Sequence, residues 1–260
     1  MGMRLGQHFL TGTWAARALT NAVDVQDGEA IVEIGPGKGA LTKELLSTGA
    51  RVVAIEKDEA LAARLEEQFA GEIRSGQLKI IADDVRNFEP AHLHLKRYVV
   101  AANIPYYITG EIIRQFLTTN RQPRAMALLV QKEVAERIIA RDGKESILSL
   151  SVKAYGTPKL VAKVSRGNFS PPPSVDSAIL LIRNISRDFF ADVDEKRFFD
   201  VIHAGFASKR KQLAGNLKKH FGDSSALALA NFPEKVRAED LALAAWGKIT
   251  AALTESSPSL

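Results

Sequence analysis

Residues 30–131 alternate short apolar runs with segments of helical periodicity. Strands are predicted at the five apolar runs, over residues 31–34, 51–55, 78–81, 98–101 and 127–130. Helices are predicted between them, over residues 41–47, 59–69 and 110–118. Apolar strands that alternate with helices typically form a parallel sheet that is covered by helices on both faces. In such a sheet a ligand binds at the carboxyl ends of the strands.

The pattern changes after residue 131. Helices are predicted over 132–139 and 147–154, and strands over 160–164 and 178–182. The segment that joins these two strands, 167–174, contains three prolines and is predicted to have no regular structure. From about Asp194 the periodicity is helical, with alanine-rich faces and no further strand. We therefore expect one domain over residues 1–184 and a small all-α domain over residues 185–260.

Composition excludes several classes of function. The chain of 260 residues is 46% hydrophobic and 25% charged, as soluble globular proteins usually are. It has no cysteine, which excludes disulfides, thiolate nucleophiles, iron–sulfur clusters and cysteine-bound zinc. The histidines form no ligand-like group with acids, so no metal is predicted. No apolar run approaches the length of about 18 residues that a membrane span needs. Because the N-terminus lacks an apolar export core, we expect a cytoplasmic protein with no membrane partner.

Charge is distributed unevenly along the chain. Lys and Arg number 35 against 30 Asp and Glu, a net charge of +5. From Tyr155 through Arg187 there are five basic residues and one acid, Asp176. A second basic cluster lies between Lys196 and Lys219. This asymmetry predicts a nucleic-acid-binding face in the later part of the chain.

A glycine-rich stretch, Glu33-Ile34-Gly35-Pro36-Gly37-Lys38-Gly39, follows the first predicted strand and opens a helix. Glycines at such a place let the backbone turn tightly and approach a ligand closely. The dinucleotide-binding fingerprint would need its third glycine at Ala40, and no Gly-Lys-Ser/Thr ends the run as a P-loop requires. The stretch therefore indicates a ligand loop of another kind.

Acids end the next two strands. Glu56 follows the second strand, where a carboxylate can accept both hydroxyls of a ribose. The third strand ends in Asp83-Asp84-Val85, where an acid can accept the amino group of an adenine. Together with the glycine loop, these acids predict a nucleoside pocket. They do not distinguish NAD from other adenosine cofactors.

The fourth strand ends in Asn103-Ile104-Pro105-Tyr106, which resembles the catalytic motif of amino-group methyltransferases that use S-adenosylmethionine. The Asn103 oxygen and a backbone carbonyl, that of Ile104, would accept hydrogen bonds from the target amine and direct its lone pair at the methyl group. Pro105 would fix the backbone between them. Tyr106 would offer a flat face to an extruded base. Because the donor is an activated sulfonium, positioning would do most of the work.

With these residues in place, the chain resembles the ribosomal RNA adenine N6,N6-dimethyltransferases over nearly its whole length. The resemblance is carried by Asn103–Tyr106 and by three further segments: Gly6-Gln7-His8-Phe9-Leu10, Phe169-Ser170-Pro171-Pro172-Pro173-Ser174-Val175-Asp176, and Phe206-Ala207-Ser208-Lys209-Arg210-Lys211-Gln212-Leu213. It implies a Rossmann-like class I methyltransferase fold, with a mostly parallel sheet and one antiparallel strand near the end. It also implies that residues 1–184 bind S-adenosylmethionine and catalyse, and that helical residues 185–260 bind RNA.

The resemblance also implies roles for individual residues. The cofactor contacts would be His8, Leu10, Gly35, Gly37, Glu56, Asp84, Val85 and Asn103. The catalytic residues would be Asn103, Pro105 and Tyr106, with the target adenine held between Tyr106 and Phe169. Lys209, Arg210 and Lys211 would contact RNA phosphates.

Two branches of this family differ in their substrate. The segment 131–135, the triple proline and the helical tail favour the branch that dimethylates two adjacent adenines near the 3′ end of 16S small-subunit rRNA during ribosome assembly. The partner would be a partly assembled ribosomal particle, not DNA, and the protein a monomer. The alternatives are a 23S rRNA methyltransferase of the macrolide-resistance type and an assembly factor whose catalysis is secondary. A nicotinamide oxidoreductase is a more distant alternative.

Overall fold

The computed structural model describes residues 8–89, 95–208, 211–222, 226–233 and 235–255. These residues form two compact units. The first unit contains the described chain up to Ala135 and the segment Thr157–Ile185. The second unit contains Glu136–Gly156 and the described residues from Ser186 onward.

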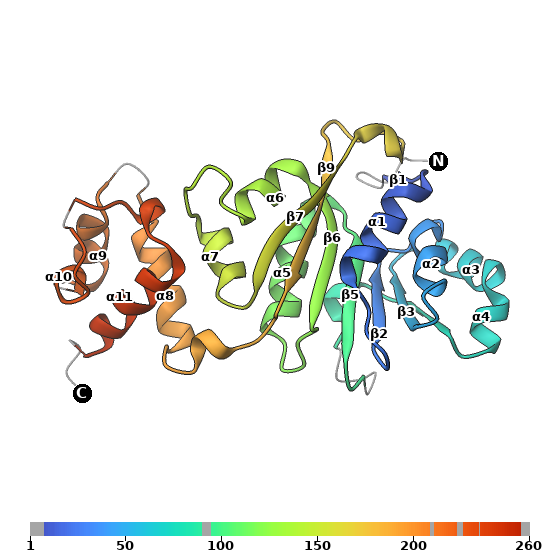
Figure 1. Ribbon diagram of the computed structural model, residues 1–260, viewed down its shortest axis with the longest axis horizontal. Helices are drawn as coiled ribbons and strands as arrows, with labels where there is room; N and C mark the ends of the chain where they lie inside the picture. The colour runs from blue at the N-terminus through green and yellow to red at the C-terminus, as the bar shows by residue number, and fades with distance from the viewer. Residues whose placement is uncertain (1–7, 90–94, 209–210, 223–225, 234, 256–260) are drawn as a thin grey trace. The chain divides into compact units, whose positions relative to one another are not determined.

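A sheet of seven strands forms the centre of the described first unit, in the order β4-β3-β2-β5-β6-β9-β7 (Figure 1). Its strands are β2 (Ala30–Ile34), β3 (Arg51–Glu56), β4 (Leu78–Ala82), β5 (Tyr98–Asn103), β6 (Ala125–Gln131), β7 (Thr157–Val164) and β9 (Ser177–Arg183). Neighbours among β2 to β6 are parallel, and β9 is antiparallel to both β6 and β7. The predicted α/β class, with one antiparallel strand near the end of the sheet, is confirmed.

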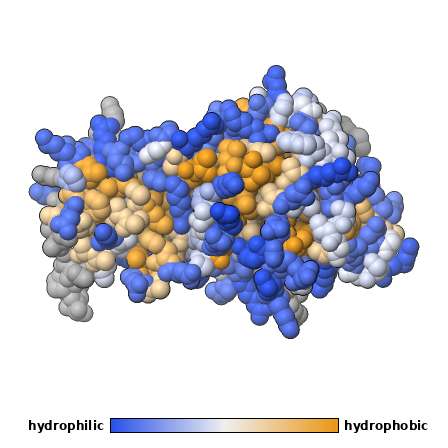
Figure 2. Space-filling model, viewed as in Figure 1, coloured by the Kyte–Doolittle hydropathy of each residue, from blue (hydrophilic) through white to orange (hydrophobic). Residues whose placement is uncertain are grey.

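Burial follows the position of each strand in the sheet. Every residue of β2 is buried, and so is every residue of β5 and β6 except the last of each. Helices therefore cover the central strands on both faces, as the continuous apolar runs predict. The edge strand β7 alternates exposed and partly buried positions before its buried last residue. Figure 2 shows a hydrophobic area near the centre of this view, with hydrophilic residues around it.

Helices occupy both sides of the sheet (Figure 1). On one face lie α1 (Thr13–Val23), α2 (Ala40–Leu46) and α3 (Glu59–Gln68), followed by the short α4 (Ala70–Arg74). On the other face lies α5 (Thr109–Thr118), which buries Ile112, Ile113, Phe116 and Leu117. The sequence pattern did not predict α1. This helix begins after Gly12, with no side-chain cap and no acid in its first turn, so the usual signals of a helix start are missing.

A second, two-stranded sheet lies beside the main one. Here β1 (Phe9–Leu10) pairs antiparallel with β8 (Phe169–Ser170). The prediction that the whole segment 167–174 lacks regular structure is therefore wrong at Phe169 and Ser170, and also at Gly167 and Asn168, which belong to the 3-10 turn η4 (Arg166–Asn168). The prolines begin only at Pro171, so the backbone groups of the two preceding residues remain free to pair.

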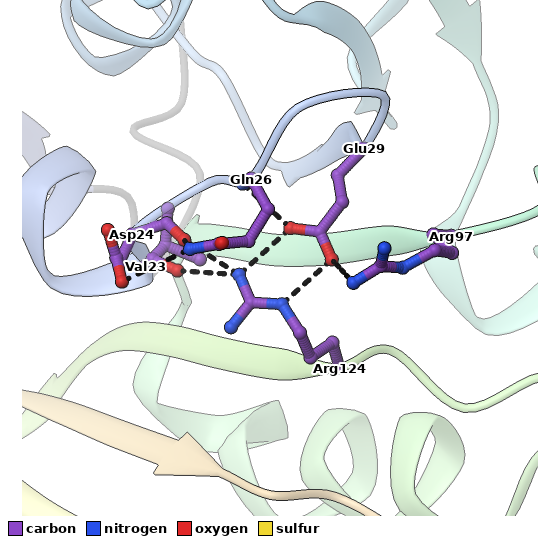
Figure 3. Close-up of polar contacts among 6 residues, drawn as sticks. All are labelled: Val23, Asp24, Gln26, Glu29, Arg97 and Arg124. Carbon is purple, nitrogen blue, oxygen red and sulfur yellow. Dashed lines mark hydrogen bonds and ion pairs between the residues drawn. The ribbon is translucent and has the colours of Figure 1, made fainter.

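A buried ion pair joins the loop before β2 to the start of β6 (Figure 3). The Glu29 side chain is inaccessible to solvent, and Arg124 donates to both of its oxygens at 2.7 and 2.8 Å. Arg124 also donates to the carbonyl of Asp24 at 2.7 Å. The cluster lies at the amino ends of β2 and β6, the edge of the sheet opposite to the carboxyl ends of these strands.

The second unit is helical. It contains the end of α6 (Lys132–Ile138) from Glu136 onward, then α7 (Ile147–Lys153), α8 (Glu195–Gly205), α9 (Leu213–Phe221), α10 (Ala226–Leu229) and α11 (Leu243–Glu255). Trp246 of α11 is fully buried and stacks on Phe206, with ring centroids 5.6 Å apart. Asn216 of α9 is buried and donates to the carbonyls of Gly205 and Ser208. This contact holds the turn that leads into the predicted RNA-binding segment.

Candidate active site

Strand register gathers the predicted site residues at one edge of the sheet. Ile34 is paired with Ile55 and with Ala102 in the two neighbouring strands. The residues one step further, Gly35, Glu56 and Asn103, therefore follow in the same row. They line a cleft in the first unit together with His8, Leu10, Gly37, Asp84, Val85, Pro105 and Tyr106. All the predicted cofactor and catalytic residues thus lie around one cavity, as the carboxyl ends of parallel strands require.

The glycine loop forms the floor of this cleft. Gly37 has a positive φ of 59°, a conformation that glycine adopts without strain. A Cβ atom at this position would lie 2.9 Å from the ring of Phe9 in β1. The Gly37 N–H donates to Glu56 Oε2 at 3.0 Å, and the Gly35 N–H donates to the Ile55 carbonyl at 2.9 Å. The loop is therefore fixed against β3, and the absence of a side chain at Gly37 allows the Phe9 ring to pack against it.

Glu56 is buried with its carboxylate held in one orientation. Its Oε2 accepts from Gly37, and its Oε1 accepts from the Asp58 N–H at 2.9 Å. A carboxylate has about four acceptor positions, so each oxygen keeps one for a further donor. Two fixed acceptors side by side suit the vicinal hydroxyls of a ribose.

Asp84 ends the loop after β4 and is bound by two cations. Its Oδ1 accepts from the Arg86 N–H and Nε at 3.0 Å each, and its Oδ2 accepts from Arg86 Nη2 at 2.5 Å and Lys57 Nζ at 2.8 Å. The Arg86 hydrogen bonds, with help from Lys57, hold the pKa of this carboxyl well below its usual range. Asp84 is therefore an anion at all physiological pH values, and sequence reasoning did not foresee either of its partners.

Asn103 is the last residue of β5, and its amide is held by the N-terminal segment. Its Nδ2 donates to the backbone carbonyl of His8 at 2.9 Å, which leaves Oδ1 as the acceptor of the side chain. The next residues make a tight turn, in which the Ile108 N–H donates to the Pro105 carbonyl at 3.1 Å. A fixed amide oxygen at the edge of the cleft can accept a hydrogen bond from an amino group.

Tyr106 and His8 stand together at the same end of the cleft. The Tyr106 hydroxyl is 2.7 Å from Ser177 Oγ, and burial raises the pKa of the phenol. His8 Nδ1 donates to the Pro171 carbonyl at 2.8 Å, and the His8 and Tyr106 rings have centroids 5.9 Å apart. Ser177 and Pro171 were not predicted as partners, because they come from β9 and the proline segment, far away in sequence.

The predicted RNA contacts are placed less completely. Phe169 is 4% exposed and packs in the hydrophobic core, where its backbone pairs with Leu10 of the cleft. Lys211 is exposed in the second unit, and Lys209 and Arg210 lie outside the described residues. The structure brings Phe169 next to the cleft wall but does not expose its ring there.

A buried acid lies under the glycine loop. Glu33 is fully buried in β2, and neither of its carboxylate oxygens has a hydrogen bond within the described part of the chain. Burial raises the pKa of Glu33 to about 8; the nearby Thr42 hydroxyl opposes the rise and the Glu56 carboxylate adds to it. The motif analysis did not single out this residue.

Comparison with known proteins decides the family. A model of the family described as ribosomal RNA adenine dimethylase matches residues 2–255. The chain belongs to this family. The resemblance inferred from the motifs is thereby confirmed for almost the entire length of this dimethylase.

Individual relatives agree with this assignment. The dimethylase is 38% identical over 252 residues to ribosomal RNA small subunit methyltransferase A of Dehalococcoides mccartyi strain CBDB1, covering 94% of this chain and 86% of the relative. It is 35% identical over 268 residues to the protein of that name from Lactobacillus delbrueckii subsp. bulgaricus, covering 96% of this chain and 90% of the relative.

Two solved structures share the fold of the dimethylase. One is the 23S rRNA methyltransferase ErmE, with a TM-score of 0.77, 23% identity and coverage of 95% and 99% of the two chains. The other is a dimethyladenosine transferase from Plasmodium falciparum, with a TM-score of 0.78, 23% identity and coverage of 95% and 98%. At this identity the likeness concerns the fold. Within the described residues, no helix of the dimethylase is long and apolar enough to span a membrane, and no three potential metal ligands gather.

Proposed function

We propose that this chain transfers methyl groups from S-adenosylmethionine to the N6 atoms of two adjacent adenosines near the 3′ end of 16S small-subunit rRNA, during ribosome assembly. The observation that carries the proposal is that residues suited to bind a nucleoside, such as Glu56, lie in one cleft with the amide oxygen of Asn103. The chain that forms this cleft belongs to the dimethylase family. The relatives named small subunit methyltransferase A, at 35% and 38% identity, favour the small subunit over the large one.

The cleft fits the cofactor group by group. Glu56 offers two oriented acceptors for the ribose hydroxyls, and Asp84 with Val85 stands where the adenine would lie. Gly35 leaves room for close backbone approach, and His8 and Leu10 also line the cleft. When bound, S-adenosylmethionine would supply a methyl group on a positively charged sulfur, which makes it a strong electrophile.

The residues of the chain would orient the target amine. Asn103 Oδ1 and the Ile104 carbonyl accept its N–H bonds, so the nitrogen lone pair points away from them toward the cofactor side of the cleft. A monomethylated adenine still has one N–H for these acceptors, which allows the second transfer. Pro105 fixes the backbone between the acceptors, and Tyr106 offers its ring as a face for the extruded base. The proton of the methylated amine is lost to water.

The remaining contacts concern RNA. Phe169 would hold the second face of the base, which requires its ring to leave the core position when the base enters. Lys211, with Lys209 and Arg210, would bind phosphates and position the RNA without reading its sequence. In this proposal residues 1–184 are the catalytic domain and residues 185–260 the RNA-binding domain. The protein acts as a cytoplasmic monomer on a partly assembled particle, not on DNA or a membrane.

The Asn103→Ala variant tests this mechanism. We expect its affinity for S-adenosylmethionine, measured by calorimetry, to stay within a few-fold of that of the wild-type protein. Single-turnover methylation of small-subunit particles should fall by about a hundredfold or more, as loss of one key positioning group does in other enzymes. The matched control is Asn120→Ala, because Asn120 is exposed and does not line the cleft. Near wild-type turnover of Asn103→Ala would refute the role of the amide.

A further inference from the structure

Tyr107 differs from every other tyrosine of the chain. The other three, Tyr98, Tyr106 and Tyr155, each hydrogen-bond through the hydroxyl. Tyr107 is 77% exposed, and no hydrogen bond to its hydroxyl is described within the resolved ranges of the chain. It nevertheless lines the cleft. An aromatic ring thus stands in solvent at the opening of the site, next in sequence to the tyrosine that faces the target base.

The backbone on both sides of Tyr107 is held firmly. It lies in the middle of the 3-10 turn η3 (Tyr106–Ile108), whose ends are closed by the hydrogen bond from the Ile108 N–H to the Pro105 carbonyl. Tyr106 is tied to Ser177, and the next residue, Thr109, is buried at the start of α5. The ring is therefore presented on a rigid support, which is what a binding contact needs.

A positive charge accompanies this ring. Arg86, whose side chain is 46% exposed and donates to Asp84 through Nε and Nη2, also lines the cleft. Proteins that bind single-stranded nucleic acid combine aromatic faces for the bases with cations along the backbone. Tyr107 and Arg86 provide this pair of groups at the cleft opening.

We propose that Tyr107 stacks on the base next to the target adenine, an assignment that rests on the proposed function. Extruding one of two adjacent adenines into the cleft removes a stacking neighbour from the other. The ring of Tyr107, beside Tyr106, supplies a face on which the remaining adenine can stack instead. Stacking makes no demand on the N6 atom, so the same face accepts the neighbouring adenine before and after its own methylation. One contact therefore serves both adenines in turn.

The first test compares three substitutions at this position. Tyr107→Ala should lower kcat/KM for small-subunit particles by about 5- to 100-fold, the range expected for loss of one base–aromatic stack. Tyr107→Phe and Tyr107→Trp should keep most of the activity, because they keep the ring. Affinity for S-adenosylmethionine and the melting temperature should not change, because the ring is exposed. The control is Trp14→Ala, since Trp14 is 52% exposed but does not line the cleft.

The second test removes the partner of the proposed contact. Reconstituted particles would carry an abasic nucleotide in place of one of the two adenines, and dimethyladenosine would be quantified at the other by mass spectrometry. The abasic change should slow methylation by the wild-type protein. It should have little further effect on Tyr107→Ala, because the effects of removing two groups in direct contact are not additive. An equal effect on both proteins, or Tyr107→Ala activity within twofold of wild type, would overturn the contact. Absence of product from wild-type protein on intact particles would instead overturn the proposed function.

Discussion

Replacing Arg124 by Met should destabilise the protein strongly, although Arg124 is far from the cleft. Its guanidinium donates to both oxygens of Glu29, whose side chain is inaccessible to solvent, and to the Asp24 carbonyl (Figure 3). Met keeps much of the apolar stem and removes every donor. The Glu29 carboxylate would then keep the Gln26 N–H at 2.9 Å and the largely exposed Arg97, 3.5 Å away.

The expected loss of stability depends on the bonds that the Glu29 carboxylate keeps. Breaking a buried ion pair by removing one partner usually costs about 3–5 kcal/mol, because an uncompensated charge stays inside. A third of the Arg124 side chain is exposed and Arg97 remains, so we expect a loss at or below the lower limit of this range, about 2–3 kcal/mol. For a protein of this size that corresponds to a decrease in melting temperature of about 4–12 °C. Arg121→Met is the matched control, an exposed arginine nearby whose replacement should change stability by less than about 0.5 kcal/mol.

Urea unfolding of the single and double variants would measure the effect. The double variant Glu29→Gln/Arg124→Met should be more stable than the sum of the two single changes predicts, by about 1–2 kcal/mol, because it leaves no buried charge. Burial would raise the pKa of Glu29, but the bonds from Arg124 and Gln26 and the charges of Arg124 and Arg97 hold it below its usual value of 4.5. The stability from this pair is therefore present above pH 4.5 and lost as pH falls through the lowered pKa. Strict additivity, or an Arg124→Met loss below about 1 kcal/mol, would refute the reasoning.

Two further predictions concern buried positions in each unit. Glu33 has a pKa raised to about 8 by burial and by the nearby Glu56, so its contribution to stability is lost as pH rises from 4.5 through 8. At pH 9 the free energy of unfolding of Glu33→Gln, measured with urea, should therefore exceed that of wild type by on the order of 3 kcal/mol, with no difference at pH 4. Equal urea midpoints at pH 9 would contradict the raised pKa. Gly205→Ala should destabilise the second unit by about 1–3 kcal/mol in thermal unfolding, because its Cβ would overlap the Trp246 ring and lie 2.9 Å from Leu213 Cδ1. An unchanged melting temperature would show that the indole can shift without loss.

Local patterns predicted much of the fold and of the cofactor site. The five strands of residues 30–131 all lie within two residues of their predicted bounds, because continuous apolar runs leave few alternatives for a short segment. Gly35, Glu56 and Asn103 were expected together because they end parallel strands, and the register places them in one row. Their position in the structure thus follows from topology alone.

Contacts between distant segments were not predictable in this way. The pairing of β9 with β6 joins residues 46 to 58 positions apart, and the pairing of β1 with β8 joins residues about 160 positions apart. Local periodicity says nothing about such distant partners. For the same reason the bond between Tyr106 and Ser177 was missed, as was the burial of Phe169. His8 was identified from the family resemblance alone, since a single histidine in a loop has no pattern.

The central claim is the transfer of methyl groups to small-subunit rRNA. The most direct measurement supplies labelled S-adenosylmethionine to unmethylated small-subunit particles in one tube and to large-subunit RNA in another. Nucleosides from both are then analysed by mass spectrometry. We expect N6,N6-dimethyladenosine from the small-subunit tube alone, at two adjacent positions. Label in the large-subunit RNA alone, or in neither tube while the cofactor still binds, would contradict the account.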